Sequence, residues 1–399
     1  MTSLDFQAID ADNHYYEAPD AFTRHIEPAM AKRAMQWADV DGKRRLLVGG
    51  RINRFIPNPL FDPVARPGVL DEYFRAKNPQ GKDIATLFGE LEPIRPEYRN
   101  RDARLHVMDE QGLAACFLFP TLAVGMEEAL RDDIPALVAA FRAFNRWMDD
   151  DWGFDYRERI FAAPYITMAD VDAAVAEVEW VIERGARIVC MRPAPVPTPT
   201  GSRSPGLRDY DPVWARINEA GLTVGFHGGD SGYGRYVNDW EPIEGMEAFR
   251  YSAFRTVVMA DRYIYDTMAA LVCHGVFDRF PNLRIASIET GSSWVVPLLK
   301  KLKKASGQMP HAFKENPTET FKRHVWVSPY YEDNLTNLKE GLGVERILFG
   351  SDWPHAEGLA NPLSFVDDLT RHGYGADELR LVMRENALQL TTRRSAVPA

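Results

Sequence analysis

Carboxylate and imidazole side chains stand at the ends of apolar runs along this chain. The first run ends in the sequence IDADNHYYE, where Asp10, Asp12 and His14 alternate and therefore lie on one face of an extended strand. Three later runs end in residues of the same kinds, which are His227, Glu289 and Asp352. Ionised carboxylates that are crowded together repel one another unless a cation lies between them. The pattern therefore predicts a metal centre.

Four of these side chains form the expected ligand set for one divalent metal ion, namely Asp12, His14, His227 and Asp352. Nitrogen and oxygen ligands without thiolate favour zinc over calcium, with manganese or iron as alternatives to zinc. Two glycines follow His227 in GLTVGFHGGD, and we expect them to leave room for a ligand and water.

The chain alternates short apolar runs with helix-like segments, and this alternation has to bring the polar residues together. The apolar runs cover 6–14, 114–120, 160–166, 187–193, 223–228, 284–290, 324–330 and 346–352. They are continuous, which is typical of strands buried on both faces of a parallel sheet. Eight such strands with helices between them predict an α/β protein with a (β/α)₈ TIM barrel. Enzymes of this fold carry out their chemistry at the carboxyl ends of the strands.

An open, doubly wound sheet is the alternative architecture. It is disfavoured because the first run is followed by HYYEAPDAF and not by a glycine-rich phosphate-binding turn. Helices are expected over 169–185, 211–221, 292–306 and 376–394, and Pro297 should kink the third of them.

Residues 41–105 interrupt the alternation of strands and helices after the first strand. They begin with GKRRLLVGGRINRFIP, which is typical of a β-hairpin that turns at Gly49-Gly50. The stretch is too long for an ordinary loop, so we expect a cap over one end of the barrel or a contact with another subunit. A second long segment, 231–254, is a further candidate for that role. The whole chain, 1–399, is expected to form a single domain with this insertion.

Composition limits the partners and the location of the protein. The net charge of −10 argues against nucleic acid or a membrane surface as a partner. No apolar stretch reaches the length of a membrane span, and the first residues lack the pattern of a secretory signal. The three cysteines are far apart, which fits a reducing compartment and gives no thiolate metal site. We therefore expect a cytoplasmic protein that acts on a small molecule.

Four motifs carry a resemblance to a known family: IDADNHYYEAPDAF, GLTVGFHGGD, FDRFPNLRIASIETGSSWVVPLL and ERILFGSDWPHAEG. They resemble the amidohydrolase-related family of the amidohydrolase 2 type, in the branch that includes aminocarboxymuconate semialdehyde decarboxylase and the aromatic-acid decarboxylases. The resemblance extends over essentially the whole chain outside 41–105. It implies one metal held by strands 1, 5 and 8, and so by the same four positions as above. Relatives are often dimers, so a homodimer is implied as well.

Two positions depart from the family pattern. Asp12 stands where relatives commonly have histidine or glutamate, and a carboxylate there is closer to the decarboxylases. Glu289 stands where strand 6 usually ends on a histidine that acts as acid and base. A carboxyl group can do the same work if apolar surroundings raise its pKa toward neutrality. Strand 4 offers Arg192 and not a lysine that could be carbamylated to bridge two metals, so one metal is expected.

The resemblance implies non-oxidative decarboxylation of a small aromatic or unsaturated carboxylic acid. Glu289 or Asp352 would move the proton, and Arg192 would bind the substrate carboxylate in a bidentate manner unless it forms a structural ion pair. Further contacts with the substrate are expected from Tyr330, Trp294 and His355.

Two other functions stay open from the sequence. Hydrolysis of an amide, ester or lactone would use the same metal to activate water, with Asp352 as its base. The other is a protein without catalysis, either a barrel that keeps the metal only for its structure or a non-catalytic binding protein. Glu17 has two possible roles. It follows His14 closely and could orient that histidine, or it could be an acidic residue at the start of a helix.

Overall fold

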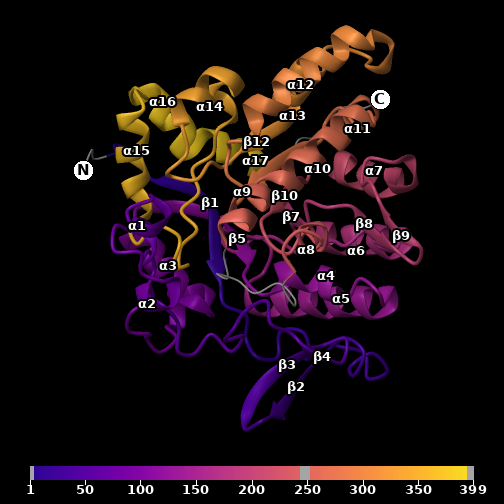
Figure 1. The fold of residues 1–399 in the computed structure, drawn as a ribbon, viewed down its shortest axis with the longest axis vertical. Coiled ribbons are helices and arrows are strands. Elements are labelled where there is room, and N and C mark those ends of the chain that lie inside the picture. Colours follow the sequence, from indigo (N-terminus) through magenta and orange to yellow (C-terminus); the bar gives the residue numbers. More distant parts are fainter. Residues whose placement is uncertain (1–3, 243–251, 393–399) are drawn as a thin grey trace.

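Two sheets of parallel strands lie at the centre of the molecule, among the helices (Figure 1). The computed structural model describes residues 4–242 and 252–392. One sheet has the order β1-β5-β6 and a second has the order β12-β11-β10-β7, and every neighbouring pair in both is parallel. The bounds are β1 (Ala8–Tyr15), β5 (Leu113–Pro120), β6 (Ile160–Ala162), β7 (Ile188–Met191), β10 (Thr223–His227), β11 (Arg284–Ile288) and β12 (Val325–Val327).

Backbone hydrogen bonds join the two sheets at both edges. Beyond β6, the N–H of Ile166 donates to the carbonyl of Cys190 in β7 at 2.9 Å. Residues 347–353 take the place of the eighth strand, since Leu348 bonds to β12 at 2.8 Å and the N–H of Ala11 in β1 donates to Phe349 at 2.8 Å. The chain thus has an α/β fold that is consistent with a TIM barrel.

Helices lie between successive strands, as the alternation predicts. The principal ones are α3 (Arg101–Glu110), α5 (Ile134–Asp151), α6 (Val171–Glu183), α7 (Asp211–Ala220), α10 (Arg262–Cys273), α12 (Val295–Gln308), α13 (Pro317–His324), α14 (Leu335–Leu342) and α15 (Phe365–Arg371). α6 begins where the Asp170 carboxylate accepts a hydrogen bond from the N–H of Ala173 at 3.0 Å. α7 ends at Gly221, which adopts a left-handed conformation with φ of +63°.

Two helices differ from the expectation. α12 runs from Val295 to Gln308 as one helix, because Pro297 lies in its first turn, where the missing N–H costs no hydrogen bond. The expected last helix is divided into α16 (Ala376–Arg380), a π-helical turn over Leu381–Glu385 and α17 (Asn386–Thr391). The end of the expected range, 393–394, lies outside the described residues.

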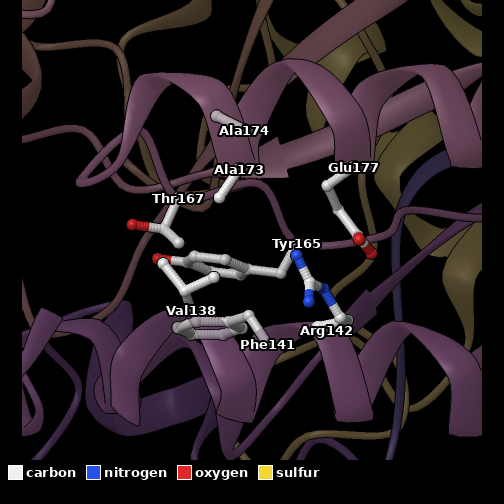
Figure 2. A pocket seen from close by; sticks show the side chains of 8 residues that line it. All are labelled: Val138, Phe141, Arg142, Tyr165, Thr167, Ala173, Ala174 and Glu177. Atoms are coloured by element: carbon white, nitrogen blue, oxygen red, sulfur yellow. The ribbon is translucent and has the colours of Figure 1, made fainter. Parts of the chain in front are cut away.

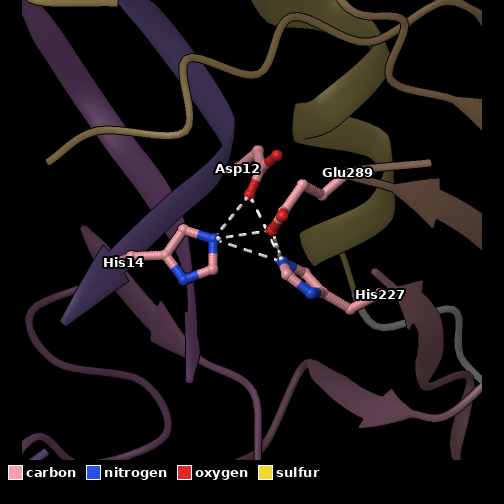
Figure 3. Close-up of side chains that lie close together, drawn as sticks. All are labelled: Asp12, His14, His227 and Glu289. Carbon is pink, nitrogen blue, oxygen red and sulfur yellow. Dashed lines mark hydrogen bonds and ion pairs between the residues drawn. The ribbon is translucent and has the colours of Figure 1, made fainter. Parts of the chain in front are cut away.

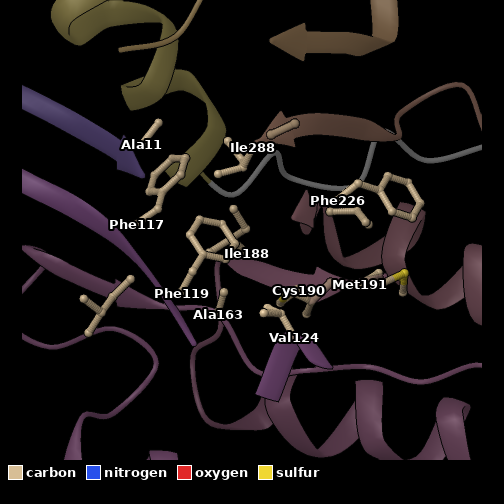
Figure 4. Close-up of a cluster of buried hydrophobic side chains, with 14 of the residues drawn as sticks. Ala11, Phe117, Phe119, Val124, Ala163, Ile188, Cys190, Met191, Phe226 and Ile288 are labelled. Atoms are coloured by element: carbon tan, nitrogen blue, oxygen red, sulfur yellow. The ribbon is translucent and has the colours of Figure 1, made fainter. Parts of the chain in front are cut away.

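Large apolar side chains fill the space below the strand ends (Figure 4). Phe119 of β5 is fully buried, and its ring centroid lies 4.7 Å from that of His227. Gly225 of β10 makes this possible, because a Cβ there would lie 2.9 Å from the Phe119 ring. The core therefore supports the imidazole of His227 from below with an apolar surface.

The segment after β1 contains the predicted hairpin and one strand more. β3 (Lys43–Val48) pairs with β4 (Arg51–Ile52) across Gly49-Gly50, as expected, and also with β2 (Met35–Val40) on its other edge. We expected the insertion to begin at residue 41. That boundary falls between β2 and β3, which pair with each other as a hairpin. The three strands project away from the ring (Figure 1).

The rest of this insertion reaches the loop that follows the eighth strand. The N–H of Gly68 donates to the carbonyl of His355 at 3.0 Å, and the N–H of Leu70 donates to Ala356 at 2.8 Å. Two short helices, α1 (Asp71–Phe74) and α2 (Ile84–Leu87), follow. The insertion thus touches the carboxyl-terminal side of the barrel, and its role as a cap or subunit contact stays a prediction.

The second long segment is described only in part. It contributes α8 (Gly234–Asn238), and α9 (Ala253–Met259) begins at its end, while 243–251 lie outside the described residues. Among the helices of the described chain, none combines the length and apolar character that crossing a membrane requires.

A buried arginine secures the carboxyl end of β1 from outside the ring. Arg104 of α3 has no exposed surface, and burial lowers its pKa to about 10. Its guanidinium donates to the carbonyl of Glu97 at 2.8 Å, to the carbonyl of His14 at 2.6 Å, and to the side-chain oxygen of Asn13. It also lies over the Trp353 ring at 4.6 Å, so it joins β1 to the eighth strand.

Replacement of Arg104 by methionine should destabilise the fold, because it leaves buried carbonyl and amide oxygens without donors. We expect the free energy of unfolding to fall by about 3 kcal/mol, since each buried unsatisfied acceptor costs about 1–3 kcal/mol. Urea unfolding of Arg104→Met measures the loss, with Arg208→Gln as a control, because Arg208 is exposed. Equal stability of Arg104→Met and wild type would contradict this role.

Candidate metal centre

Four side chains meet at the carboxyl ends of the barrel strands (Figure 3). They are Asp12 and His14 of β1, His227 at the end of β10, and Glu289 directly after β11. Each offers one ligand atom, and these atoms all lie within 4.8 Å of one another. Asp10 shares the face of β1 with them but lies deeper, where its carboxylate accepts a hydrogen bond from the N–H of Ser351 at 2.9 Å.

The spacing of the four donor atoms fits a single ion. Nε2 of His14 lies 3.2 Å from Oδ1 of Asp12 and 3.5 Å from Oε2 of Glu289. Nε2 of His227 lies 3.2 Å from the same Glu289 oxygen and 3.6 Å from the same Asp12 oxygen. The two Nε2 atoms are 3.2 Å apart. Four donors placed tetrahedrally around an ion, with bonds of about 2.0–2.2 Å, are roughly 3.3–3.6 Å apart.

The hydrogen bonds around these donors leave their lone pairs directed at the cluster. Nδ1 of His227 lies 2.8 Å from the carbonyl of Gly228, and a carbonyl oxygen can only accept a hydrogen bond. Nδ1 therefore carries the proton, and the lone pair of Nε2 can bind a cation. Oδ1 of Asp12 is buried and has no hydrogen-bond partner in the described chain. Such an acceptor is costly to bury unless a cation binds it. The residues present therefore fit a divalent cation.

Electrostatics within the cluster lead to the same conclusion. Burial acts to raise the pKa of Asp12, but the two histidines beside its carboxylate hold that pKa below its usual value. Burial acts to lower the pKa of His14, yet Asp12 and Glu289 raise it to about 9. Burial and the charge of Glu289 raise the pKa of Asp352 well above its usual value. The carboxylates thus favour a positive charge among them, which is a proton in the absence of metal.

Two strand-end residues reach the cluster from unusual backbone conformations. Glu289 and Asp352 both have positive φ, at +50° and +56°, a region that non-glycine residues seldom occupy and that is common at functional sites. The Tyr330 hydroxyl donates to the carbonyl of Glu289 at 3.0 Å and helps to hold that turn. A Cβ at Gly228 would collide with the same carbonyl. This glycine therefore makes room for the backbone of Glu289, and not for a ligand and water as expected.

Glu289 belongs to the same group of donors as Asp12, His14 and His227. Three of the predicted ligands lie together with it, whereas Oδ1 of Asp352 lies 3.4 Å from Nε2 of His14 and belongs to a second group. That group consists of His14, Glu289, Asp352 and His355. The two groups share His14 and Glu289, so they lie side by side. Asp352 as a ligand stays a prediction.

The cluster opens on one side. The side chains of His14 and His227 have no exposed surface, and that of Asp12 is 5% exposed. The side chain of Glu289 is 26% exposed and that of Asp352 is 14% exposed. A small molecule would therefore approach the cluster over these two carboxylates.

Two of the expected substrate contacts have other partners. The Arg192 guanidinium donates to Oε2 of Glu128 at 2.7 Å and to the carbonyl of Pro195 at 3.0 Å. The contact with Glu128 favours a structural ion pair as the role of Arg192 over bidentate binding of a substrate carboxylate. Trp294 is buried, and its Nε1–H donates to the carbonyl of Gly291 at 3.0 Å, so its ring belongs to the core.

The other two expected contacts lie beside the cluster. Tyr330 is 37% exposed and touches Glu289 through the hydrogen bond already described. His355 places Nδ1 2.6 Å from Oδ1 of Asp352, and its ring centroid lies 4.0 Å from that of His14. Whether either residue binds a substrate stays a prediction.

Sequence reasoning missed one carboxyl group at the site and left another undecided. Glu357 is half-buried near Glu289, and burial raises its pKa to about 8. The motif GSDWPHAEG contained it, but only the fold brings it to the cluster. Glu17 fulfils neither expected role, because its carboxylate accepts hydrogen bonds from the N–H groups of Leu122 at 2.8 Å and Ala123 at 3.0 Å. It anchors the loop after β5.

A small cavity also lies between α5 and α6 (Figure 2). Its lining consists of Val138, Phe141, Arg142, Tyr165, Thr167, Ala173, Ala174 and Glu177. The buried polar groups there have protein partners: Tyr165 and Thr167 both donate to Glu127, at 2.9 and 2.8 Å, and Glu177 accepts from Asn145 at 2.9 Å. The group formed by Asp12, His14, His227 and Glu289 is therefore the candidate site for chemistry.

Comparisons with known proteins place the chain in a family. The amidohydrolase family model matches residues 9–390. An amidohydrolase of known structure from Mycobacterium avium subsp. paratuberculosis K-10 is 48% identical, with a TM-score of 0.92, and the match covers 98% of this chain and 100% of that one.

More distant solved structures share the fold. A dihydroxybenzoic acid decarboxylase from Polaromonas sp. JS666, solved with bound manganese, is 17% identical over 81% of this chain and 93% of its own, with a TM-score of 0.57. A 5-carboxyvanillate decarboxylase from Novosphingobium aromaticivorans, also with manganese, is 13% identical over 97% of both chains, with a TM-score of 0.58.

Removal of one histidine should abolish metal binding. We expect about one divalent metal ion per wild-type chain, and less than about a tenth of that in His227→Ala, because a four-donor site loses most of its affinity with one ligand. Inductively coupled plasma mass spectrometry of the purified proteins measures this content. His311→Ala serves as the control, since His311 is exposed and outside the cluster. Full metal content in His227→Ala would contradict the assignment.

Proposed function

We propose, because the chain belongs to the amidohydrolase family, that it is a metal-dependent, non-oxidative decarboxylase of a small aromatic or unsaturated carboxylic acid. One observation carries the proposal: donors spaced for a single ion lie beside a further carboxyl group, Asp352, on the open side of the cluster. The two manganese-containing decarboxylases that share the fold give it additional support.

The metal would be held by Asp12, His14, His227 and Glu289. A divalent cation there would bind substrate oxygens and withdraw electron density from the reacting carbon. Zinc suits this donor set, and the manganese of the distant relatives makes that ion the other candidate.

Asp352 is the group that we assign to proton transfer. Decarboxylation of an aromatic acid replaces the bond between the ring and the carboxylate by a C–H bond, so a proton must reach the ring carbon as carbon dioxide leaves. Asp352 lies on the open side and has His355 as a neighbour at 2.6 Å, which suits a group that gives and regains a proton. Glu289, the other candidate from the sequence, acts as a ligand in this proposal.

Hydrolysis is a second candidate, and a specific observation favours it. The Mycobacterium avium relative, 48% identical, is called an amidohydrolase. In that reaction Asp352 would take a proton from water instead of giving one to carbon. The products distinguish the two reactions, because only decarboxylation releases carbon dioxide.

Matched substitutions should separate the ligand from the acid–base group. Glu289→Gln removes a donor, so we expect metal affinity to fall by at least about 10–100-fold, the loss typical of a weakened metal shell. Asp352→Asn should keep its metal but lose about 10²–10⁴-fold in turnover, the usual contribution of a general acid. Both are measured by metal titration and by carbon dioxide release from a panel of hydroxybenzoates and small unsaturated acids.

Glu340→Gln is the control, because Glu340 is exposed on α14. A panel of lactones, esters and amides is assayed in parallel. Hydrolysis of that panel without carbon dioxide release from the acids would favour the second candidate. Full turnover of Asp352→Asn would contradict the role of Asp352 in either reaction.

A further inference from the structure

The three-stranded sheet of β2, β3 and β4 has one face in the core and one face without a partner. Met35 of β2 and Leu46 and Val48 of β3 are buried in the hydrophobic core, and Met35 pairs with Val48 across the two strands. Side chains alternate along a strand, so the residues between these point the other way. Because the sheet projects from the barrel (Figure 1), we call this second side its outward face.

Apolar side chains form the middle of the outward face. They are Ala38, Val40, Leu47 and Ile52, and the register of the strands brings Leu47 opposite Ile52. Ile52 is 40% exposed, and within the described chain none of the four packs against the hydrophobic core. An apolar surface left to solvent is unfavourable, and such a surface on a projecting element is typical of a contact with another molecule.

Basic side chains surround these apolar residues. Lys43 and Arg45 of β3 lie on the same face as Val40. Residues 35–54 contain five basic and two acidic residues, although the whole chain has a net charge of −10. Among the described residues, no carboxylate forms an ion pair with any of the five, which are Lys43, Arg44, Arg45, Arg51 and Arg54.

The composition of the outward face favours a protein over a nucleic acid or a membrane. Single-stranded nucleic acid stacks on exposed aromatic rings, and a membrane interface takes up protruding Trp, Phe or Leu side chains. Trp37, the only aromatic residue of 35–54, lies on the other face, where its Nε1–H donates to the carbonyl of Pro19 at 2.6 Å. An apolar centre with a charged rim is the usual composition of a protein interface.

Charge then favours a second copy of this chain as the partner. A positive rim needs a negative surface opposite it, and the chain without residues 35–54 is more acidic than the whole. Two such sheets would repel each other, so each has to contact the acidic body of the other copy. A two-fold axis provides both contacts at once, because each copy then gives its sheet and receives the other.

We propose that residues 35–54, the basic arm, join two copies of this chain into a dimer, with each arm lying on an acidic surface of the other copy. The arm supplies no donor to the candidate metal centre. The proposal is therefore independent of the metal and of the proposed function.

Sedimentation equilibrium of the full-length protein tests the proposal. Lys43→Glu/Arg45→Glu reverses two charges of the outward face, and Ile52→Asp places a negative charge in its apolar centre. The control, Lys303→Glu/Lys304→Glu, makes the same charge change at two exposed lysines of α12. We expect a dimer for the wild type and the control, and a dissociation constant at least about tenfold higher in each arm variant, because like charges then face each other.

A second measurement does not depend on the variants. Carbodiimide crosslinking of a mixture of unlabelled and nitrogen-15-labelled wild-type chains should join Lys43 to a carboxylate of the other copy, as mass spectrometry reads from the mixed isotopes. The dimer should also weaken at high salt, since salt screens its charge pairs. Thermal unfolding reports whether each variant folds, and crosslinking decides the question if a variant does not.

Three results would overturn the proposal. One is a wild-type protein that is monomeric at all concentrations tested. Another is a dimer with an unchanged dissociation constant in both folded arm variants, because the contact would then lie elsewhere. The third is a monomer that binds duplex DNA or vesicles of anionic phospholipid and loses that binding in Lys43→Glu/Arg45→Glu, since the arm would then serve a different partner.

Discussion

Negative charge confined at the end of a closed ring of strands is the constraint on which this structure depends. Asp12 and Glu289 lie within a few ångströms of His14 and His227, which have no exposed surface, and Asp352 lies equally near His14. Buried carboxylates at such distances are unfavourable without a positive partner. A divalent ion would meet that need, and the spacing of the donors fits a single ion. The remaining features of the site position these groups or move a proton among them.

The sequence was sufficient for the parts of the fold that follow from periodicity. Continuous apolar runs indicated parallel strands, and alternation in β1 placed Asp12 and His14 on one face, as the structure has them. The sequence was insufficient to predict the positions of side chains at the turns that follow the strands. Glu289 and Asp352 both follow apolar runs and both have positive φ, but only Glu289 shares a donor group with Asp12 and His227. A pattern of residue types carries no such information.

Contacts between loops were equally hidden in the sequence. Arg192 has the chemistry of a carboxylate clamp, but its guanidinium already binds Glu128, which belongs to none of the motifs. Thr121 belongs to none of the motifs, and a threonine at the end of a strand is common. It became visible only when the fold brought it to His355. Residues of this kind are found from hydrogen-bond directions, which require coordinates.

Anomalous diffraction from crystals of the protein, collected on both sides of the zinc and manganese absorption edges, tests the central claim most directly. The account predicts one strong peak per chain, located among the side chains of Asp12, His14, His227 and Glu289, at bonding distance from their donor atoms. A peak bound elsewhere, or none in protein supplied with these metals, would contradict it.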